Sequence, residues 1–281
     1  MAHSPSLSAA SPAPRPWRPT PAIRASVALH FGAGALALAH SSSWPWALSA
    51  VIANHLLLTA AGLWPRSALL GPNLTHLPPD AGPAAVALTI DDGPDPGITA
   101  RVLDLLDEHQ ARATFFCVGE RVTRHAALTR EIVARQHEIG NHSYRHLNRF
   151  ALLGPRSLSD EVRRAQQAIF DATGETPRFF RAPAGLRNPF LEPVLAHEGL
   201  QLASWTRRGF DTVSGRAHAV LDRLTRNLRA GDILLLHDGH AARTPAGTPV
   251  ILEVLPQLLA ACKAAQLTPI TLRAALTRAA P

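Results

Sequence analysis

Short apolar runs alternate with longer amphipathic segments from about residue 84 to residue 275. The apolar runs predict strands at 86–90, 113–118, 138–140, 178–181, 201–205, 233–236 and 269–272. The amphipathic segments predict helices, among them 100–110, 159–173 and 250–266. Gly174 directly follows the helix predicted at 159–173 and is expected to end it. Strands that alternate with helices are typical of a parallel sheet. Six or seven such units in about 200 residues favour an α/β barrel, somewhat smaller than the eightfold one, over an open sheet.

A stretch without Asp, Glu, Lys or Arg, residues 25–65, precedes this domain. At about 1.5 Å per residue a helix of this length extends roughly 60 Å, enough for two short crossings of a hydrocarbon core about 30 Å thick. The sequence SSSWPW at 41–46 supplies a break between the two halves. We therefore expect a membrane hairpin. The alternatives are a single span over 46–64 with the first half at the membrane interface, helices of a soluble core, and a cleaved signal peptide.

The segments on either side of this stretch are polar or rich in proline. Residues 1–24 contain much Pro, Ser and Ala and three arginines but no acidic residue, which predicts a disordered basic tail. Residues 66–83 are expected to be a linker, and the α/β domain is assigned to 84–281. The chain is thus expected to be anchored in a bacterial-type inner membrane, with lipid as one partner and the side of the domain left open.

Composition narrows the classes of partner. The net charge is +7 and the sequence pI is about 11.0. The cations are arginines scattered along the chain, with Lys263 the only lysine, so the charge favours solvated helix faces and attraction to anionic surfaces over nucleic-acid binding. Cys117 and Cys262 lie in apolar stretches, and two cysteines provide neither a disulfide framework nor a cysteine metal site. Both are expected to be small buried core residues.

Adjacent carboxylates, Asp91 and Asp92, follow the first predicted strand in LTIDDGPDPG at 88–97. Like charges this close repel each other, so the pair calls for a compensating cation. His142 and His146, in NHSYRH, follow another strand four residues apart, a spacing that can place both rings on one face of a helical turn. Two histidines and a carboxylate leave coordination positions open for water, as in hydrolytic metal sites. One aspartate would bind the cation, and the other would stay free as a base.

Three further groups at or after strand ends suit the same chemistry. Arg181, in FFRAP, can pair with the free aspartate and keep it ionised. His237, in ILLLHD, is placed to act as a general acid toward a leaving amine. Asp211, which ends ASWTRRGFD, is a candidate partner that orients His237 and raises its pKa. Taken singly, these residues also fit a surface ion pair, a satisfied buried histidine and a loop cap.

The segments TIDDGPD, HSYRH, RAPAG and LLLHD, in this order and spacing, resemble the signature segments of the polysaccharide deacetylases. This carbohydrate esterase family shares the rhizobial nodulation-deacetylase homology domain, and the resemblance covers about residues 84–275. It implies a distorted (β/α) barrel of about seven strands and one divalent metal ion, commonly zinc, held by Asp92, His142 and His146. It also implies Asp91 as the base with Arg181 beside it, and His237 as the acid.

Three residues are assigned to the substrate pocket. The resemblance implies that Leu235 forms a wall for the acetyl methyl group. Ala184 stands where family members often have an aromatic residue, so its backbone N–H is the group left to donate to an oxyanion. The family's fourth segment usually has Trp shortly after its Asp, whereas here Trp205 precedes Asp211. We assign Trp205 to substrate binding.

The expected activity is metal-dependent hydrolysis of the N-acetyl amide of an amino-sugar glycan, which releases acetate and a free amine. One alternative is a lipid-linked amino sugar at the membrane. A phosphatase with an aspartate nucleophile fits less well, because such enzymes space their carboxylates by one residue and need no histidine pair. A further alternative is an inactive relative that only binds carbohydrate. Such a protein would have no need of the base, the acid and all three metal ligands, which are present here.

Overall fold

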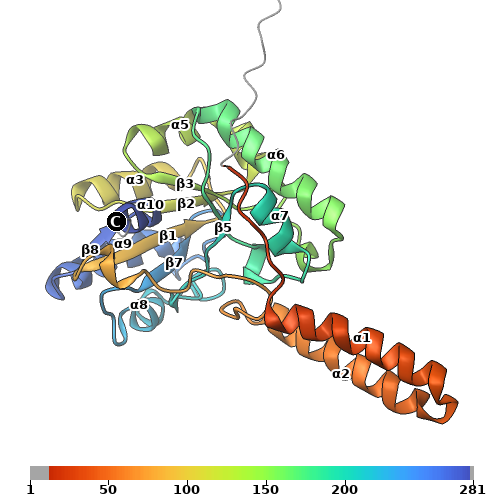
Figure 1. Ribbon diagram of the computed structural model, residues 1–281. Coiled ribbons are helices and arrows are strands. Elements are labelled where there is room, and N and C mark those ends of the chain that lie inside the picture. The colour runs from red at the N-terminus through yellow and green to blue at the C-terminus, as the bar shows by residue number, and fades with distance from the viewer. Residues whose placement is uncertain (1–12, 279–281) are drawn as a thin grey trace, which may run out of the picture.

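Eight strands form one parallel sheet in the computed structural model, which describes residues 13–278. They are β1 Ala85–Asp91, β2 Thr114–Cys117, β3 Glu138–Asn141, β4 Phe179–Phe180, β5 Gln201–Leu202, β6 Arg207–Arg208, β7 Ile233–His237 and β8 Thr268–Ile270. Their order is β5-β4-β3-β2-β1-β7-β6, with β8 beside the start of β1. The sheet curls (Figure 1), and its hydrogen-bonded path ends at β5 and β6 without joining them in the described residues. The expected distorted α/β barrel is confirmed.

Alternating side chains on the strands serve two apolar layers. In β1, Val86, Leu88 and Ile90 belong to the cluster formed with the helices outside the sheet, whereas Ala85 and Ala87 belong to a second cluster. All seven residues of β1 are buried, as is usual for a parallel strand covered on both faces. Since neighbouring side chains point to opposite faces, the second face continues through Thr89 to Asp91, so the same strand leads from the core to the pocket described below.

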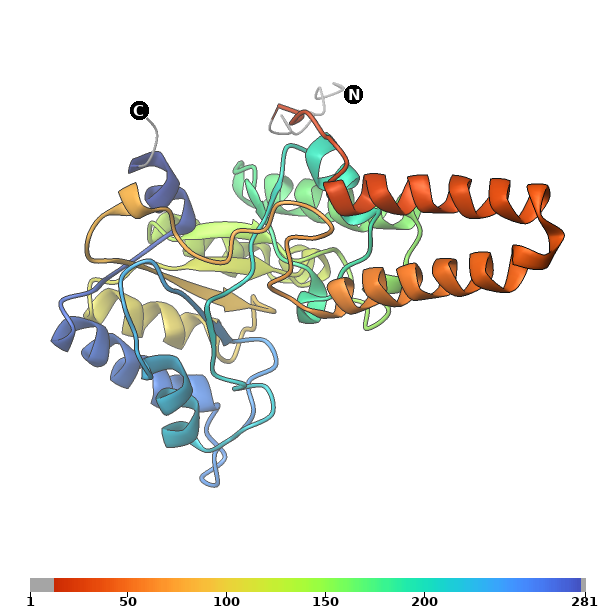
Figure 2. The ribbon, with the colours of Figure 1, turned by 60° about the horizontal axis from the view of Figure 1, so that its bottom comes forward.

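Helices surround the sheet in Figures 1 and 2. They are α3 Thr99–Glu108, α4 Gly119–Arg124, α5 Ala126–Ala134, α6 Pro155–Thr173, α7 Leu191–His197, α8 Ala217–Thr225, α9 Val250–Ala264 and α10 Leu272–Arg278, with short 3-10 turns at Pro79–Ala81, Phe150–Leu152 and Pro183–Gly185. Gly174 ends α6 with a φ of 72°, as expected for a glycine cap. Cys117 and Cys262 are free and buried, so that expectation is also confirmed.

Two predicted strands end two or three residues early in the structure, and one observed strand was not predicted. The run 269–272 does not stay extended to its end, because Thr271 accepts a hydrogen bond from the N–H of Ala274 and α10 begins at Leu272. The run 201–205 is a strand only over Gln201–Leu202, and the carbonyls of the next residues accept from the Arg181 side chain. Strand β6 consists of two arginines, so it contains no apolar run from which it could have been predicted.

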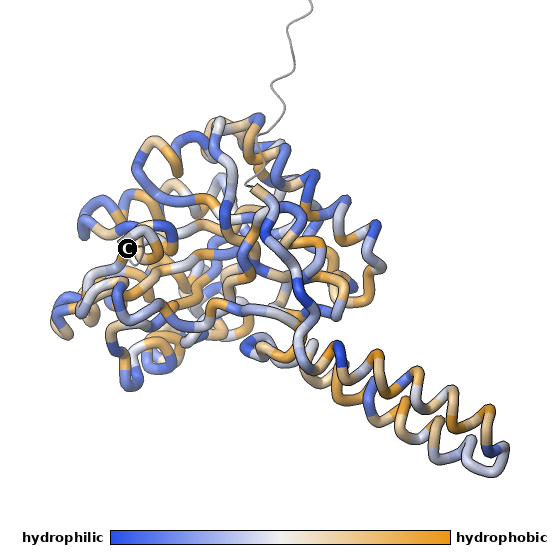
Figure 3. Tube along the Cα trace, in the orientation of Figure 1, coloured by the Kyte–Doolittle hydropathy of each residue, from blue (hydrophilic) through white to orange (hydrophobic). Residues whose placement is uncertain are grey.

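A pair of antiparallel helices projects from the domain (Figure 2): α1 Pro21–Ala39 and α2 Trp44–Leu63, joined by a 3-10 turn at Ser41–Ser43. Their apolar residues dominate the hydropathy trace of this arm in Figure 3. Pro21–Ala39 and Ser41–Leu63 are long and apolar enough to cross a membrane, each with a mean hydropathy of 1.5, and only 6% and 22% of the respective apolar windows are buried. By length and composition alone this is weak evidence for two spans. The first helix starts at Pro21, four residues before the uncharged stretch, because Thr20 caps it.

The segments expected to be loose are packed in part. Within residues 66–83, Leu70, Leu77 and Ala81 are buried, and the backbone of Leu74 pairs with Ala203 beside β5, so apolar contacts hold this segment on the domain. Residues 1–12 of the expected tail lie outside the described residues. Arg15 is described and pairs with Glu192 of α7 at 3.0 Å, which ties the part of the tail that precedes α1 to the domain.

Candidate active site

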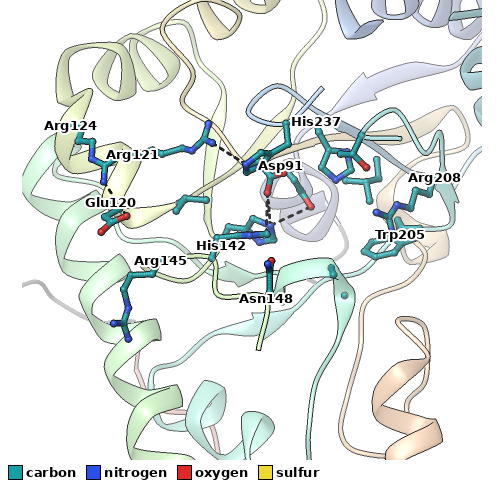
Figure 4. A pocket seen from close by; sticks show the side chains of 18 residues that line it. Asp91, Glu120, Arg121, Arg124, His142, Arg145, Asn148, Trp205, Arg208 and His237 are labelled. Atoms are coloured by element: carbon teal, nitrogen blue, oxygen red, sulfur yellow. Dashed lines mark hydrogen bonds and ion pairs between the residues drawn. The ribbon is translucent and has the colours of Figure 1, made fainter. Parts of the chain in front are cut away.

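The carboxyl ends of the central strands open into a cavity of about 490 Å³ (Figure 4). Asp91 ends β1 and His237 ends β7, and the two residues are register partners in the sheet. The loop after β3 contributes His142 and His146, and Arg181 follows β4. The strand order therefore brings residues from four segments of the sequence to one edge of the sheet, where active sites of such barrels lie.

Asp91 is held by a buried guanidinium. Arg181 is 1% exposed, and its Nη1 donates to Asp91 Oδ1 at 2.6 Å. The other guanidinium nitrogens donate to the backbone carbonyls of Ala203 and Ser204 at 3.1 and 2.8 Å, and Nη1 also reaches Thr89 Oγ1. Four of the five N–H donors of the guanidinium are thus bound by the barrel interior. The charge-assisted bond fixes the orientation of the Asp91 carboxylate at the edge of the cavity.

Asp92 faces two histidines instead. Its Oδ1 lies 3.2 Å from His142 Nε2 and 3.2 Å from His146 Nε2, yet this buried oxygen has no hydrogen-bond partner among the described residues. The ligand atoms of all three residues lie within 4.8 Å of one another. A converging oxygen and two imidazole nitrogens, with the oxygen otherwise unsatisfied, fit a divalent cation such as zinc.

The surroundings of the three residues suit metal binding. His142 Nδ1 lies 2.8 Å from the carbonyl oxygen of Arg181, so donation there leaves Nε2 as the free acceptor that a metal needs. Burial and the neighbouring His142 lower the pKa of His146 to about 4, which keeps it neutral at pH 7. Burial acts to raise the pKa of Asp92, but the contacts with His142 and His240 outweigh it and hold the pKa well below its ordinary value. His146 is therefore neutral and Asp92 is ionised, the forms in which these side chains bind a metal ion.

His237 and Asp211 form a second pair across the same cavity. His237 Nδ1 lies 2.9 Å from Asp211 Oδ1, and the backbone N–H of His237 donates to Asp211 Oδ2 at 2.7 Å. Burial lowers the pKa of His237, but the hydrogen bond and charge of Asp211 raise it by more, so the net shift is upward. This leaves Nε2 to carry a proton toward the cavity, where Figure 4 places the ring beside Asp91.

The residues assigned to the substrate also line the cavity. Leu235 and Trp205 are both part of its wall, and each is nearly fully buried. Ala184 lies in the 3-10 turn Pro183–Gly185 with a φ of 54°, so the turn carries a backbone conformation unusual for alanine at the cavity. All ten residues singled out from the sequence thus meet at one place.

Sequence reasoning missed other residues of the cavity. His240 Nδ1 lies 2.9 Å from Asp92 Oδ2, and its place three residues after His237 was the available signal. Four arginines also line the cavity, namely Arg121, Arg124, Arg145 and Arg208, with Glu120, Asn148 and Thr212. No local pattern marks these arginines among the many in the chain, because only the fold brings them together.

A parallel α/β barrel with this pairing of carboxylates, histidines and a buried arginine defines an enzyme of the hydrolase class. A family description of the polysaccharide deacetylases matches residues 79–203. The peptidoglycan N-acetylglucosamine deacetylase of Bacillus cereus is 34% identical over 175 residues, which cover 62% of this chain and 81% of that protein. The chitooligosaccharide deacetylase of Sinorhizobium fredii is 37% identical over 159 residues, covering 56% and 74%.

A solved structure agrees with the sequence comparisons. A family 4 carbohydrate esterase from Streptomyces lividans, in complex with acetate, is 30% identical and superposes with a TM-score of 0.60 over 66% of this chain and 91% of that one. The chain belongs to the polysaccharide deacetylase family.

Proposed function

We propose that this protein is a metal-dependent deacetylase of a glycan that contains N-acetylglucosamine, and that it releases acetate and a free amine. One observation carries the proposal: a buried Asp91–Arg181 pair lies beside the Asp92, His142 and His146 set, with the His237–Asp211 pair across the same cavity. The names of the two relatives refer to peptidoglycan and chitooligosaccharides, which supports N-acetylglucosamine as the sugar in the substrate.

Asp92, His142 and His146 would hold the metal ion, which would supply electrophilic polarisation of the amide carbonyl. Asp91 accepts a proton from the water that attacks this carbonyl, and Arg181 keeps the carboxylate oriented for the transfer. The backbone N–H of Ala184 donates to the oxyanion that develops. Leu235 packs against the acetyl methyl group and excludes water from that side.

His237 completes the reaction. The carbon–nitrogen bond breaks as His237 gives its proton to the departing nitrogen, which leaves as a neutral amine while the carbonyl carbon becomes acetic acid. The acid loses its proton to solvent to give acetate, and exchange with solvent removes the proton from Asp91 and restores that of His237. Asp211 holds the imidazole through Nδ1 so that the opposite nitrogen faces the cavity. One water is consumed, and one acetate and one amine appear.

The test is acetate release from chitotetraose and from peptidoglycan glycan chains by the purified full chain in detergent. Asp91→Asn should keep the metal and lower turnover by roughly two to four orders of magnitude, the usual contribution of a positioned base. Metal content, measured on the same sample, separates the two roles. Loss of metal in Asp91→Asn would show that the adjacent aspartates have exchanged roles, and wild-type turnover in this variant would refute the mechanism.

We further propose that α1 and α2 anchor the enzyme in a bacterial-type inner membrane. The anchor lies close to the active site, because Pro65, two residues after α2, accepts a hydrogen bond from Ser204 beside the cavity wall. A lipid-linked amino sugar is therefore a second candidate substrate, favoured by this short connection between the helices and the cavity.

A further inference from the structure

Four arginines line the active-site cavity, and three of them have a carboxylate partner. Arg121 pairs with Asp95 at 3.8 Å, Arg124 with Glu120 at 3.2 Å, and Arg145 with the buried Glu161 at 2.6 Å. The fourth, Arg208, has no hydrogen-bond or ion-pair partner in residues 13–278, and its Nε is buried and unsatisfied. Buried and half-buried charges are normally paired, so the exception calls for a reason.

Arg208 is held in place by aromatic rings instead of by an anion. Its guanidinium carbon lies 5.3 Å from the centre of the Trp205 ring and 5.1 Å from that of Phe210. Strand pairing fixes the backbone, because Arg208 stands opposite Leu235 of β7. The adjacent Arg207 points elsewhere and pairs with Asp232. Stacking on aromatic rings orients the guanidinium without neutralising it.

The cavity's own acidic groups are already occupied by other partners. Asp91 is paired with Arg181, and Asp211 with His237. With both of these acids paired, the guanidinium of Arg208 is a positive charge that no carboxylate of residues 13–278 neutralises on this side of the cavity. An N-acetyl amide is neutral and needs no such charge. This positive charge is therefore matched to another part of the substrate.

We propose that Arg208 binds an anionic group of the glycan, a carboxylate or a phosphate carried close to the N-acetylated sugar. The proposal rests on the deacetylase function above and narrows its substrate class to acidic glycans or phosphate-linked sugars. Figure 4 shows Arg208 beside Trp205 on the His237 side of the cavity. A planar guanidinium there can donate two parallel hydrogen bonds to either kind of anion. A neutral chitooligosaccharide leaves this site without a partner.

Three substrates test the proposal: chitotetraose, which is neutral; a glycan-chain tetrasaccharide with free lactyl carboxylates; and N-acetylglucosamine joined to a short prenyl diphosphate. The wild-type chain should favour at least one anionic substrate by about tenfold or more in kcat/KM, the value of a charge-assisted pair. The tetrasaccharide and the diphosphate distinguish a carboxylate source from a phosphate source. The preference should decline as salt is raised.

Arg208→Gln should lower kcat/KM for the anionic substrate about tenfold more than for chitotetraose, mainly through KM. Arg208→Lys should retain part of the preference, because it keeps the charge but not the fork. The matched control is Arg124→Gln, which removes a cavity arginine that is already paired with Glu120, and it should keep the wild-type ratio between anionic and neutral substrates.

Several results would overturn the anion site. They are equal use of all three substrates by the wild type, an equal loss for all three in Arg208→Gln, or a change limited to inhibition by the acetate product. Calorimetric binding of the same oligosaccharides separates this proposal from the proposed function. Tight, Arg208-dependent binding of an anionic ligand without any hydrolysis would refute the deacetylase activity and leave the anion site standing.

Discussion

Asp91 and Asp92 are neighbours in the chain, but their carboxylates meet different partners. Strand β1 ends at Asp91, and Asp92 has a φ of 75°, in the left-handed region that Asp tolerates better than most residues. The turn sends one carboxylate to Arg181 and the other to His142 and His146. The repulsion expected between adjacent acids is therefore offset by two separate partners.

The metal site should depend on the histidine nitrogens that converge on Asp92. His142→Ala and His146→Ala should each lose the divalent ion on dialysis, because two ligands hold a cation far less tightly than three. Elemental analysis of the dialysed protein measures this loss. His240→Ala is the control: its ring contacts Asp92 Oδ2 but its side chain is 53% exposed and lies outside the converging set. A full complement of metal in either ligand variant would place the site elsewhere.

The Asp211–His237 pair should determine the alkaline limb of the rate profile. His237 must be protonated to expel the amine, and its raised pKa extends the protonated form to higher pH. In Asp211→Asn the burial that lowers the pKa acts without the opposing carboxylate, so the alkaline limb of kcat/KM should move to lower pH by about one unit or more. His237→Ala should remove the limb. A profile unchanged in both variants would exclude His237 from catalysis.

Three elements meet at Gly185, whose φ is 76°. A Cβ at this position would lie 2.6 Å from the Trp205 ring and 2.7 Å from Pro65. The contact thus joins the turn Pro183–Gly185, the cavity wall and the chain that leaves α2. Gly174, at the end of α6, has a similar φ of 72° but open space around its Cβ position.

These two glycines form a matched pair for testing how closely the elements pack. Gly174→Ala should cost only the backbone strain, about 1 kcal/mol. Gly185→Ala should cost this strain plus about 1–3 kcal/mol for overpacking, and it should raise KM because Trp205 lines the cavity. Thermal unfolding and steady-state kinetics of both variants measure the difference. Equal losses of stability in the two variants and an unaltered KM would mean that Trp205 and Pro65 move to accommodate the added methyl group without strain.

The arm formed by α1 and α2 returns the chain to the domain from which it departs (Figures 1 and 2). If the arm crosses a membrane, both of its ends therefore lie on one side. Arg15, Arg18 and Arg66 flank the two helices and Arg24 lies near the start of α1, whereas the turn between the helices carries no charge. The positive-inside rule then predicts that the domain faces the cytoplasm, where lipid-linked and soluble sugars would be within reach.

Cysteine labelling tests this topology. An impermeant thiol reagent added to intact spheroplasts should modify Ser42→Cys in the turn but not Val213→Cys, which replaces a side chain that is 82% exposed on the domain. The native Cys117 and Cys262 are 0% and 1% exposed and should not react with the reagent. Both variants should react after lysis. The reverse pattern before lysis would establish an exported domain and favour a cell-envelope glycan as substrate.

The amino-acid sequence determined most of the strands, the long helices and the family. It also singled out the residues Asp91, Asp92, His142, His146, Arg181, Asp211 and His237, which the fold brings together. The period of hydrophobic positions, the turn residues and the spacing of motifs are local properties of the chain. The apolar runs were long enough to reveal most strands and the long helices. It did not reveal β6, which is two arginines held in the sheet by pairing with β7. Nor did it show that residues 66–83 pack on the domain, since burial of Leu70 and Leu77 depends on surfaces formed elsewhere in the chain.

Only the tertiary structure decided which charges are left without a partner. Arg121, Arg124, Arg145 and Arg208 look alike in the sequence. Arg124 pairs with Glu120 at the i,i+4 spacing of one helix, but the pairs Arg121–Asp95 and Arg145–Glu161 join segments far apart in the chain, which no spacing rule encodes. Curling of the sheet brings Arg208 to the cavity while the available acids pair with other groups. Charge–charge interactions act through space across the folded chain, and for that reason the substrate preference of this site is a property of the fold.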